Sequence, residues 1–141
     1  MTYLNTKEAK YLEAHLFESI VLVNQNGLDF RLQKLPAEAQ FSPIEAIEVL
    51  DVNQDGYLDL VLGGNKTGAS PYYGAYQGSW GQVIMGDSLG NFKTDTQNRL
   101  KIRGDVRGIK KVSVNAFTWL IYAKNDGALE VVQIDEAKPF E

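Results

Sequence analysis

The amino-acid sequence predicts an all-β fold of antiparallel strands in a single domain over residues 1–141. Short runs rich in Val, Ile and Leu alternate with turns that carry Asn, Asp and Gly, a pattern typical of strands. With 44% hydrophobic residues, the chain can bury one globular core. A strand–turn–strand plan recurs three times, which favours antiparallel meander blades of a partial β-propeller over a sandwich or a barrel.

The N-terminal part of the chain is expected to form a short helix and then half a blade. Helix-forming residues dominate residues 6–17, and Thr6 or Asn5 could cap the helix. The half blade spans residues 19–35 and turns at Gly27. Its strands are expected over residues 19–24 and 28–35.

The middle of the chain predicts a complete blade over residues 44–95. Two apolar strands flank an acidic turn, and two more strands follow a long polar and aromatic loop over residues 63–79. The four strands are expected over residues 44–50, 57–62, 82–85 and 91–95.

The C-terminal part predicts a third, degenerate blade over residues 109–134. Its hairpin turn contains Asp126 and Gly127, a dipeptide common in tight turns. The strands are expected over residues 109–115, 117–124 and 128–134. The segment has no series of Asp residues before its second strand, so we expect one metal site in the chain and not three.

The turn of the middle blade, residues 51–59, is the most specific motif of the sequence and is called the acidic loop below. Calcium takes six to eight hard oxygen ligands, and Gly56 at the sixth position permits the sharp turn that wraps them. The motif therefore predicts Ca²⁺ as a cofactor. The expected ligands are Asp51, Asn53, Asp55, Tyr57 through its carbonyl, and Asp59.

The acidic loop is not an EF-hand. An EF-hand needs a bidentate Glu at position twelve and a helix on each side, whereas Leu62 occupies that position here and both flanks are strand-like. A plain acidic turn is the alternative, because Asn, Asp and Gly all favour turns. Charge argues against that alternative, since two carboxylates about 4 Å apart repel by roughly 4 kcal/mol at an effective dielectric near 20.

Composition disfavours several classes of function. The net charge of −4 makes a nucleic-acid partner unexpected, and the absence of cysteine rules out disulfides and thiol catalysis. The apolar runs are far shorter than the roughly 20 residues that span a bilayer. His15 is the only histidine, so zinc or Ser-His-Asp chemistry is not expected, and we expect no enzyme activity. Residues 1–30 lack signal-peptide features, so an exported parent would make this chain a fragment or mature segment.

The loop before the third strand of the middle blade is dense in Tyr, Gly and Trp. Aromatic rings offer rigid contact area for a sugar or a peptide, although such rings can also fold back onto the blade. The candidate ligand-binding residues are Tyr72, Tyr73, Tyr76 and Trp80.

Two three-residue sequence motifs are weaker evidence of function. A glycosylation sequon starts at Asn65, and residues 103–105 spell an Arg-Gly-Asp tripeptide that integrins bind. A chance match is the better explanation of the first, and a connector between blades is the better explanation of the second.

Residues 44–95 resemble the FG-GAP or VCBS repeat, the blade of calcium-binding β-propellers. They show an apolar strand, an Asp-x-Asn-x-Asp-Gly-x-x-Asp loop, a second strand, a variable loop, a third strand, and the Gly-x-Phe fourth strand of Gly90 and Phe92. Roughly residues 15–135 are similar to the C-terminal repeats of ASPIC/UnbV-type, cartilage-acidic-protein-like bacterial surface proteins. Phe41, Pro43 and the connector at Gly104 carry this similarity.

The resemblance implies a calcium-binding, non-catalytic binding or adhesion module that is secreted or displayed on the cell surface. One Ca²⁺ would rigidify the acidic loop. The alternatives are an accessory carbohydrate-binding domain of an extracellular polysaccharide-active enzyme and a purely structural assembly module. A closed propeller needs at least four blades, and the chain predicts about two and a half. Its open edges are therefore expected to pack on further blades or on a second copy, while the identity of the protein or carbohydrate ligand stays open.

Overall fold

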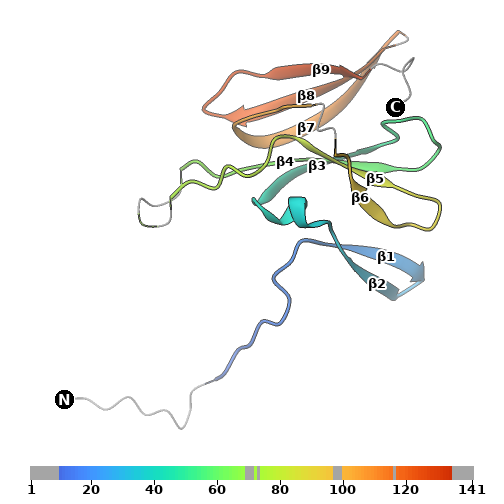
Figure 1. Cartoon of the computed structure of the whole chain (residues 1–141), viewed down its shortest axis with the longest axis vertical. Coiled ribbons are helices and arrows are strands. Elements are labelled where there is room, and N and C mark those ends of the chain that lie inside the picture. The colour runs from blue at the N-terminus through green and yellow to red at the C-terminus, as the bar shows by residue number, and fades with distance from the viewer. Residues whose placement is uncertain (1–9, 69–71, 73, 97–99, 116, 135–141) are drawn as a thin grey trace.

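The computed structural model describes residues 10–68, 72, 74–96, 100–115 and 117–134. Within these residues the protein is all-β with antiparallel pairing throughout, as the sequence predicts. The strands form three sheets that are stacked in chain order (Figure 1). The described strands form no closed sheet, so the propeller and its repeat number stay a prediction.

The first sheet is a hairpin, and the second and third sheets are up-and-down meanders. The hairpin pairs β1 (Ile20–Asn26) with β2 (Asp29–Lys34), and a 3₁₀ turn, Ala37–Gln40, leads on to the second sheet. The second or central sheet contains β3 (Ile44–Leu50), β4 (Asp59–Gly64), β5 (Gln82–Gly86) and β6 (Phe92–Thr94). The third contains β7 (Asp105–Val114), β8 (Phe117–Asn125) and β9 (Glu130–Ile134).

Every predicted strand is present, and the start of β7 differs most from the prediction. Strand β4 begins at Asp59 and not at Tyr57, because the acidic loop extends to that point. Strand β7 begins at Asp105, four residues before the predicted start at 109, and its early residue Val106 is buried in the core.

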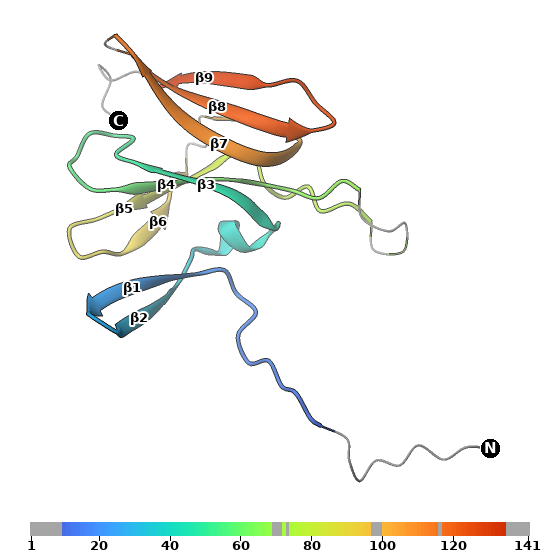
Figure 2. The same ribbon diagram turned by 180° about the vertical axis from the view of Figure 1, so that it is seen from behind.

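The predicted helix over residues 6–17 is wrong for the part that the structure describes. Residues 10–17 have no regular secondary structure, and the segment leads away from the sheets (Figure 2). Tyr11 is 86% exposed and Phe17 is 84% exposed. A helix this short is marginal in water unless one face packs on the protein, which explains the failure of a prediction made from propensity. Residues 6–9 lie outside the described residues.

Strand β4 in the central sheet is buried on both faces, which explains its unbroken apolar run. Successive side chains of a strand point to opposite faces. Leu62 and Ile84 therefore pack with Leu35 and Ala39 in a core against the first sheet. Val61 faces the other way into a larger core with the third sheet, whose buried members include Leu50, Val106, Ile109, Leu120, Tyr122 and Ile134.

The outward faces of the two outer sheets also carry apolar side chains. On the first sheet, Leu22 pairs with Leu32 across the hairpin, and both are about half exposed. On the third sheet, Val114 pairs with Phe117, again about half exposed, with Val131 on the same face. Exposed apolar sheet faces of this kind mark surfaces that are suited to further packing.

Candidate functional site

The acidic loop joins β3 to β4 at one end of the central sheet (Figure 1). It turns through two residues with positive φ, Gln54 at +61° and Gly56 at +89°. Glycine adopts this conformation without steric cost, which agrees with the role predicted for Gly56. The loop is therefore compact, and its ends lie at Leu50 and Asp59, which face each other across the β3–β4 ladder.

Asp59, the ninth residue of the loop, is fully buried at the start of β4. Its Oδ2 accepts a hydrogen bond from the backbone N–H of Val52, and its Oδ1 accepts one from Gly86 of β5, both at 2.8 Å. Burial raises the pKa of the Asp59 carboxyl above its usual range. The two N–H groups lower this pKa, while the nearby carboxylates of Asp55 and Asp51 raise it further.

The other predicted ligands turn toward the backbone of the loop. Asp51 accepts hydrogen bonds from the N–H of Asp55 at 3.2 Å and of Gly56 at 2.8 Å. Asn53 accepts from the N–H of Asp55 at 3.1 Å and donates its side-chain N–H to the Asp55 carboxylate at 2.8 Å. Asp55 accepts from the N–H of Tyr57 at 2.8 Å. The loop is thus cross-linked by the same side chains that the sequence predicts as ligands.

The geometry and the chemistry of the loop give different indications for a metal. The described part of the chain contains no ready-made group of three or more His, Cys, Asp or Glu side chains around one point. The donor set nevertheless fits calcium, because it consists of hard carboxylate and amide oxygens. No described Lys or Arg forms an ion pair with Asp51, Asp55 or Asp59. A buried carboxylate beside two others is stable when protonated or when a cation lies nearby, so we judge that the residues fit the ion.

Of the four predicted ligand-binding aromatics, the three that the structure describes are not brought together. Trp80 lines a hollow at the end of the central sheet opposite the acidic loop. Tyr76 forms a two-stranded backbone bridge with Lys66, with N···O distances of 2.8 and 3.0 Å. Tyr72 is 96% exposed, and Tyr73 lies outside the described residues.

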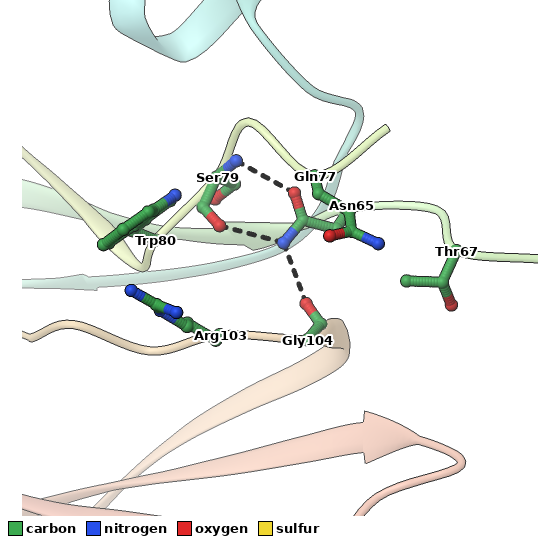
Figure 3. Close-up of a pocket in the computed structure, with 7 residues that line it drawn as sticks. All are labelled: Asn65, Thr67, Gln77, Ser79, Trp80, Arg103 and Gly104. Atoms are coloured by element: carbon green, nitrogen blue, oxygen red, sulfur yellow. Dashed lines mark hydrogen bonds between the residues drawn. The ribbon is translucent and has the colours of Figure 1, made fainter. Parts of the chain in front are cut away.

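Asn65 holds the walls of this hollow together (Figure 3). Its side-chain N–H₂ donates to the carbonyls of Ser79 and Gly104, each at 2.9 Å. Its Oδ1 accepts from the N–H of Ser79 at 2.9 Å and from the hydroxyl of Ser42 at 2.8 Å. These bonds connect the end of β4, the loop before β5 and the connector before β7. The side-chain amide of Asn65, the sequon residue, is therefore hydrogen-bonded inside the fold, and Asn65 is only 3% exposed.

Arg103 also lines the hollow, and its guanidinium carbon lies 4.1 Å from the centroid of the Trp80 ring. This is a cation–π contact. Sequence reasoning did not include Arg103 among the site residues, because its position beside Trp80 depends on the path of the connector. The only sequence signal was the Arg-Gly-Asp tripeptide. That tripeptide is not displayed, since Asp105 is buried and lies 2.7 Å from Arg107.

No protein-family model, curated protein or solved structure matches this chain. The resemblance to the FG-GAP repeat therefore stays a prediction that rests on the residues of the acidic loop and its flanking strands. Among the residues that the structure describes, no helix has the length and apolar character needed to cross a membrane.

Proposed function

We propose that the protein is a calcium-binding, non-catalytic binding or adhesion module in which the acidic loop holds one ion. The single observation that carries the proposal is the fully buried Asp59 carboxylate, which lies near Asp51 and Asp55 without a basic partner among the described residues. The ion would supply the positive charge that these carboxylates lack. It would be held by Asp51, Asn53, Asp55, the carbonyl of Tyr57, and Asp59.

With its carboxylates neutralised by the ion, the acidic loop would connect three strands. Asp59 starts β4, accepts a bond from Val52 directly after β3, and accepts another from Gly86 at the end of β5. Ordering the carboxylates therefore stiffens one end of the central sheet. Extracellular calcium modules typically bind with Kd near 10⁻⁴–10⁻³ M. We accordingly propose that the protein acts outside the cell or on its surface, where calcium is millimolar.

The stacking of three sheets supports the further proposal that they are consecutive blades of a partial propeller. The half-exposed apolar faces at Leu22 and Leu32 and at Val114 and Phe117 support packing on further blades or on a second copy. Light scattering over a range of protein concentrations tests the second copy. A strict monomer at high concentration would argue for further blades alone.

Thermal melting of the purified chain tests the calcium proposal. At a calcium concentration ten times Kd, linkage predicts about 1.4 kcal/mol of stabilisation, which corresponds to a rise in Tm of roughly 5 °C. MgCl₂ at the same concentration should have little effect, because Mg²⁺ demands tighter octahedral geometry. Asp55→Ala should abolish most of the calcium-dependent rise. Asp29→Ala, which removes an exposed carboxylate at the start of β2, is the matched control and should retain it.

Equal melting temperatures in chelator and in CaCl₂ would contradict the proposal and leave a turn cross-linked by its own side chains. An equal decrease in Tm for Asp55→Ala in chelator and in CaCl₂ would also contradict the proposal.

A second candidate function, an accessory carbohydrate-binding domain, is favoured by a different observation. The hollow lined by Trp80 and Arg103 combines an aromatic ring, a cation and neutral polar side chains at the end of the sheet opposite the acidic loop. Sites of this composition suit sugars, since rings pack on C–H surfaces and polar groups bind hydroxyls.

A further inference from the structure

We propose that the hollow lined by Trp80 and Arg103 is a binding site for a carboxylated sugar, in which Arg103 binds the carboxylate. The proposal rests on the carbohydrate-binding candidate above and names its ligand class. It does not depend on calcium binding at the other end of the sheet.

The hollow has the size and rigidity of a small site. Its volume is about 180 Å³, below the range of drug-sized ligand pockets, so it has room for a single ring. Its walls are fixed in advance by the four hydrogen bonds of Asn65, which connect segments up to 39 residues apart in sequence. A site whose walls are already ordered loses less entropy on binding than one that must form around its ligand.

Arg103 is the charged group in the hollow, and its charge has no carboxylate partner among the described residues. Its guanidinium lies over the Trp80 ring, and none of the described carboxylates forms an ion pair with it. The contrast with Arg107 is informative, because Arg107 lies 2.8 Å from Glu45 and 2.7 Å from Asp105. A guanidinium stays ionised and presents donors in a planar fork that matches a carboxylate. Arg103 therefore offers fixed donors to an anion, in a chain whose net charge is −4.

The remaining lining residues select a sugar over an acidic side chain. Gln77 lines the hollow with an amide, a group that pairs with sugar hydroxyls (Figure 3), whereas the hydroxyl of Thr67 already donates to the Asp105 carboxylate at 3.4 Å. Trp80 is 42% exposed and leaves apolar ring surface for the C–H groups of a sugar ring. An Asp or Glu side chain would use the guanidinium but leave the exposed ring surface of Trp80 and the amide of Gln77 without partners. A uronic acid uses all of these features at once.

Titration of the full chain with sodium glucuronate and sodium galacturonate, followed by Trp80 fluorescence, tests the proposal. The chain has two Trp residues, so Trp119→Phe leaves Trp80 as the only indole. Glucose and galactose are the neutral counterparts, and N-acetylglutamate represents an acidic peptide side chain. We expect at least one uronate to bind about tenfold or more tightly than its neutral sugar, since charge-assisted hydrogen bonds are the strong ones.

Substitutions at the hollow and beside it identify the group responsible. Arg103→Gln should weaken uronate binding about tenfold or more, and Arg103→Lys should recover only part of it, because lysine keeps the charge but loses the fork. Lys101→Gln removes the same charge two residues away, from an exposed side chain that does not line the hollow, and should change affinity less than twofold. Circular dichroism confirms that each variant is folded.

Three outcomes would overturn the proposal: no response to either uronate up to its solubility limit, equal affinity for uronate and neutral sugar, or unchanged uronate affinity in Arg103→Gln. Binding of N-acetylglutamate as tight as that of the uronate would reject the sugar class. Running each titration in chelator and in CaCl₂ separates this result from the calcium proposal, which is decided by melting temperature and not by sugar binding.

Discussion

Two acidic turns lie at the same end of the central sheet and differ in what surrounds their carboxylates (Figure 1). In the turn between β5 and β6, Asp87 accepts 2.8 Å hydrogen bonds from the N–H groups of Leu89 and Asn91. In the acidic loop, Asp59 also accepts two backbone N–H bonds of 2.8 Å. The backbone hydrogen bonding of the two side chains is therefore alike.

Burial and neighbouring charge separate them. Asp87 is partly exposed, and its hydrogen bonds from Asn91, together with the nearby Lys93, lower its pKa. Asp59 is fully buried near two other carboxylates, and its pKa is raised. The hydrogen bonds of its own turn are enough to account for the Asp87 carboxylate. The Asp59 carboxylate is in addition buried near two other carboxylates, and these hydrogen bonds do not account for that concentration of negative charge. That difference is the reason to expect a cation at one turn and none at the other.

The largest expected effect is the loss of stability when the carboxylate of Asp59 or of Asp87 is removed. Asp59→Ala leaves the N–H groups of Val52 and Gly86 without an acceptor, at a cost of about 2–4 kcal/mol in the free energy of unfolding with calcium present. Asp87→Ala should cost less, because water can replace the lost acceptor. Urea unfolding in CaCl₂ and in chelator measures both variants. Calcium-dependent stability that survives Asp59→Ala would remove the distinction between the two turns.

A smaller loss of stability is expected when Gly86 or Gly90, at the turn between β5 and β6, is replaced by Ala. A Cβ at Gly86 would lie 2.3 Å from the carbonyl oxygen of Leu58, so Gly86→Ala must push β5 away from the acidic loop, at about 1–3 kcal/mol. A Cβ at Gly90 would meet only the end of the Arg31 side chain, at an ordinary contact distance of 3.8 Å, but the residue has a φ of +70°, a strain of about 1–2 kcal/mol for Gly90→Ala. Calcium titration of the two variants sharpens the comparison. We expect weaker calcium stabilisation for Gly86→Ala only, and an equal response from both would mean that the Gly86–Asp59 bond does not support the loop.

The smallest effect is the pH dependence of stability, and it should have opposite signs at the two turns. Because the folded pKa of Asp87 is lowered, its contribution is present above the unfolded value of about 3.9 and is lost as pH falls through the folded pKa. Because the folded pKa of Asp59 is raised, its contribution is present below about 3.9 and is lost as pH rises through the folded pKa. Urea unfolding in chelator from about pH 3 to pH 6 compares the wild type with Asp87→Asn and Asp59→Asn. Identical slopes in the two variants would contradict this assignment.

The sequence predicted regular elements well wherever local pattern and burial agree. The strand over residues 44–50 coincides with β3, because its apolar residues are bounded by a Pro and by the acidic loop. The N-terminal helix failed for the described residues because helix propensity alone does not stabilise a segment without a packing surface. The loop aromatics were identified as a group, yet among those that the structure describes only Trp80 lines the hollow, since composition does not say which ring meets a partner from another segment.

By itself, the sequence determined the all-β class, the order of the strands and the acidic loop, because hydrophobic period, turn residues and ligand spacing are local properties. Tertiary structure decided that Asp59 is buried and that Arg103 lies over Trp80. Asp59 becomes fully buried through β5, and Arg103 meets Trp80 through a connector fixed by Asn65. Both outcomes depend on contacts between segments far apart in the chain, and burial and charge pairing arise only once those segments are packed together.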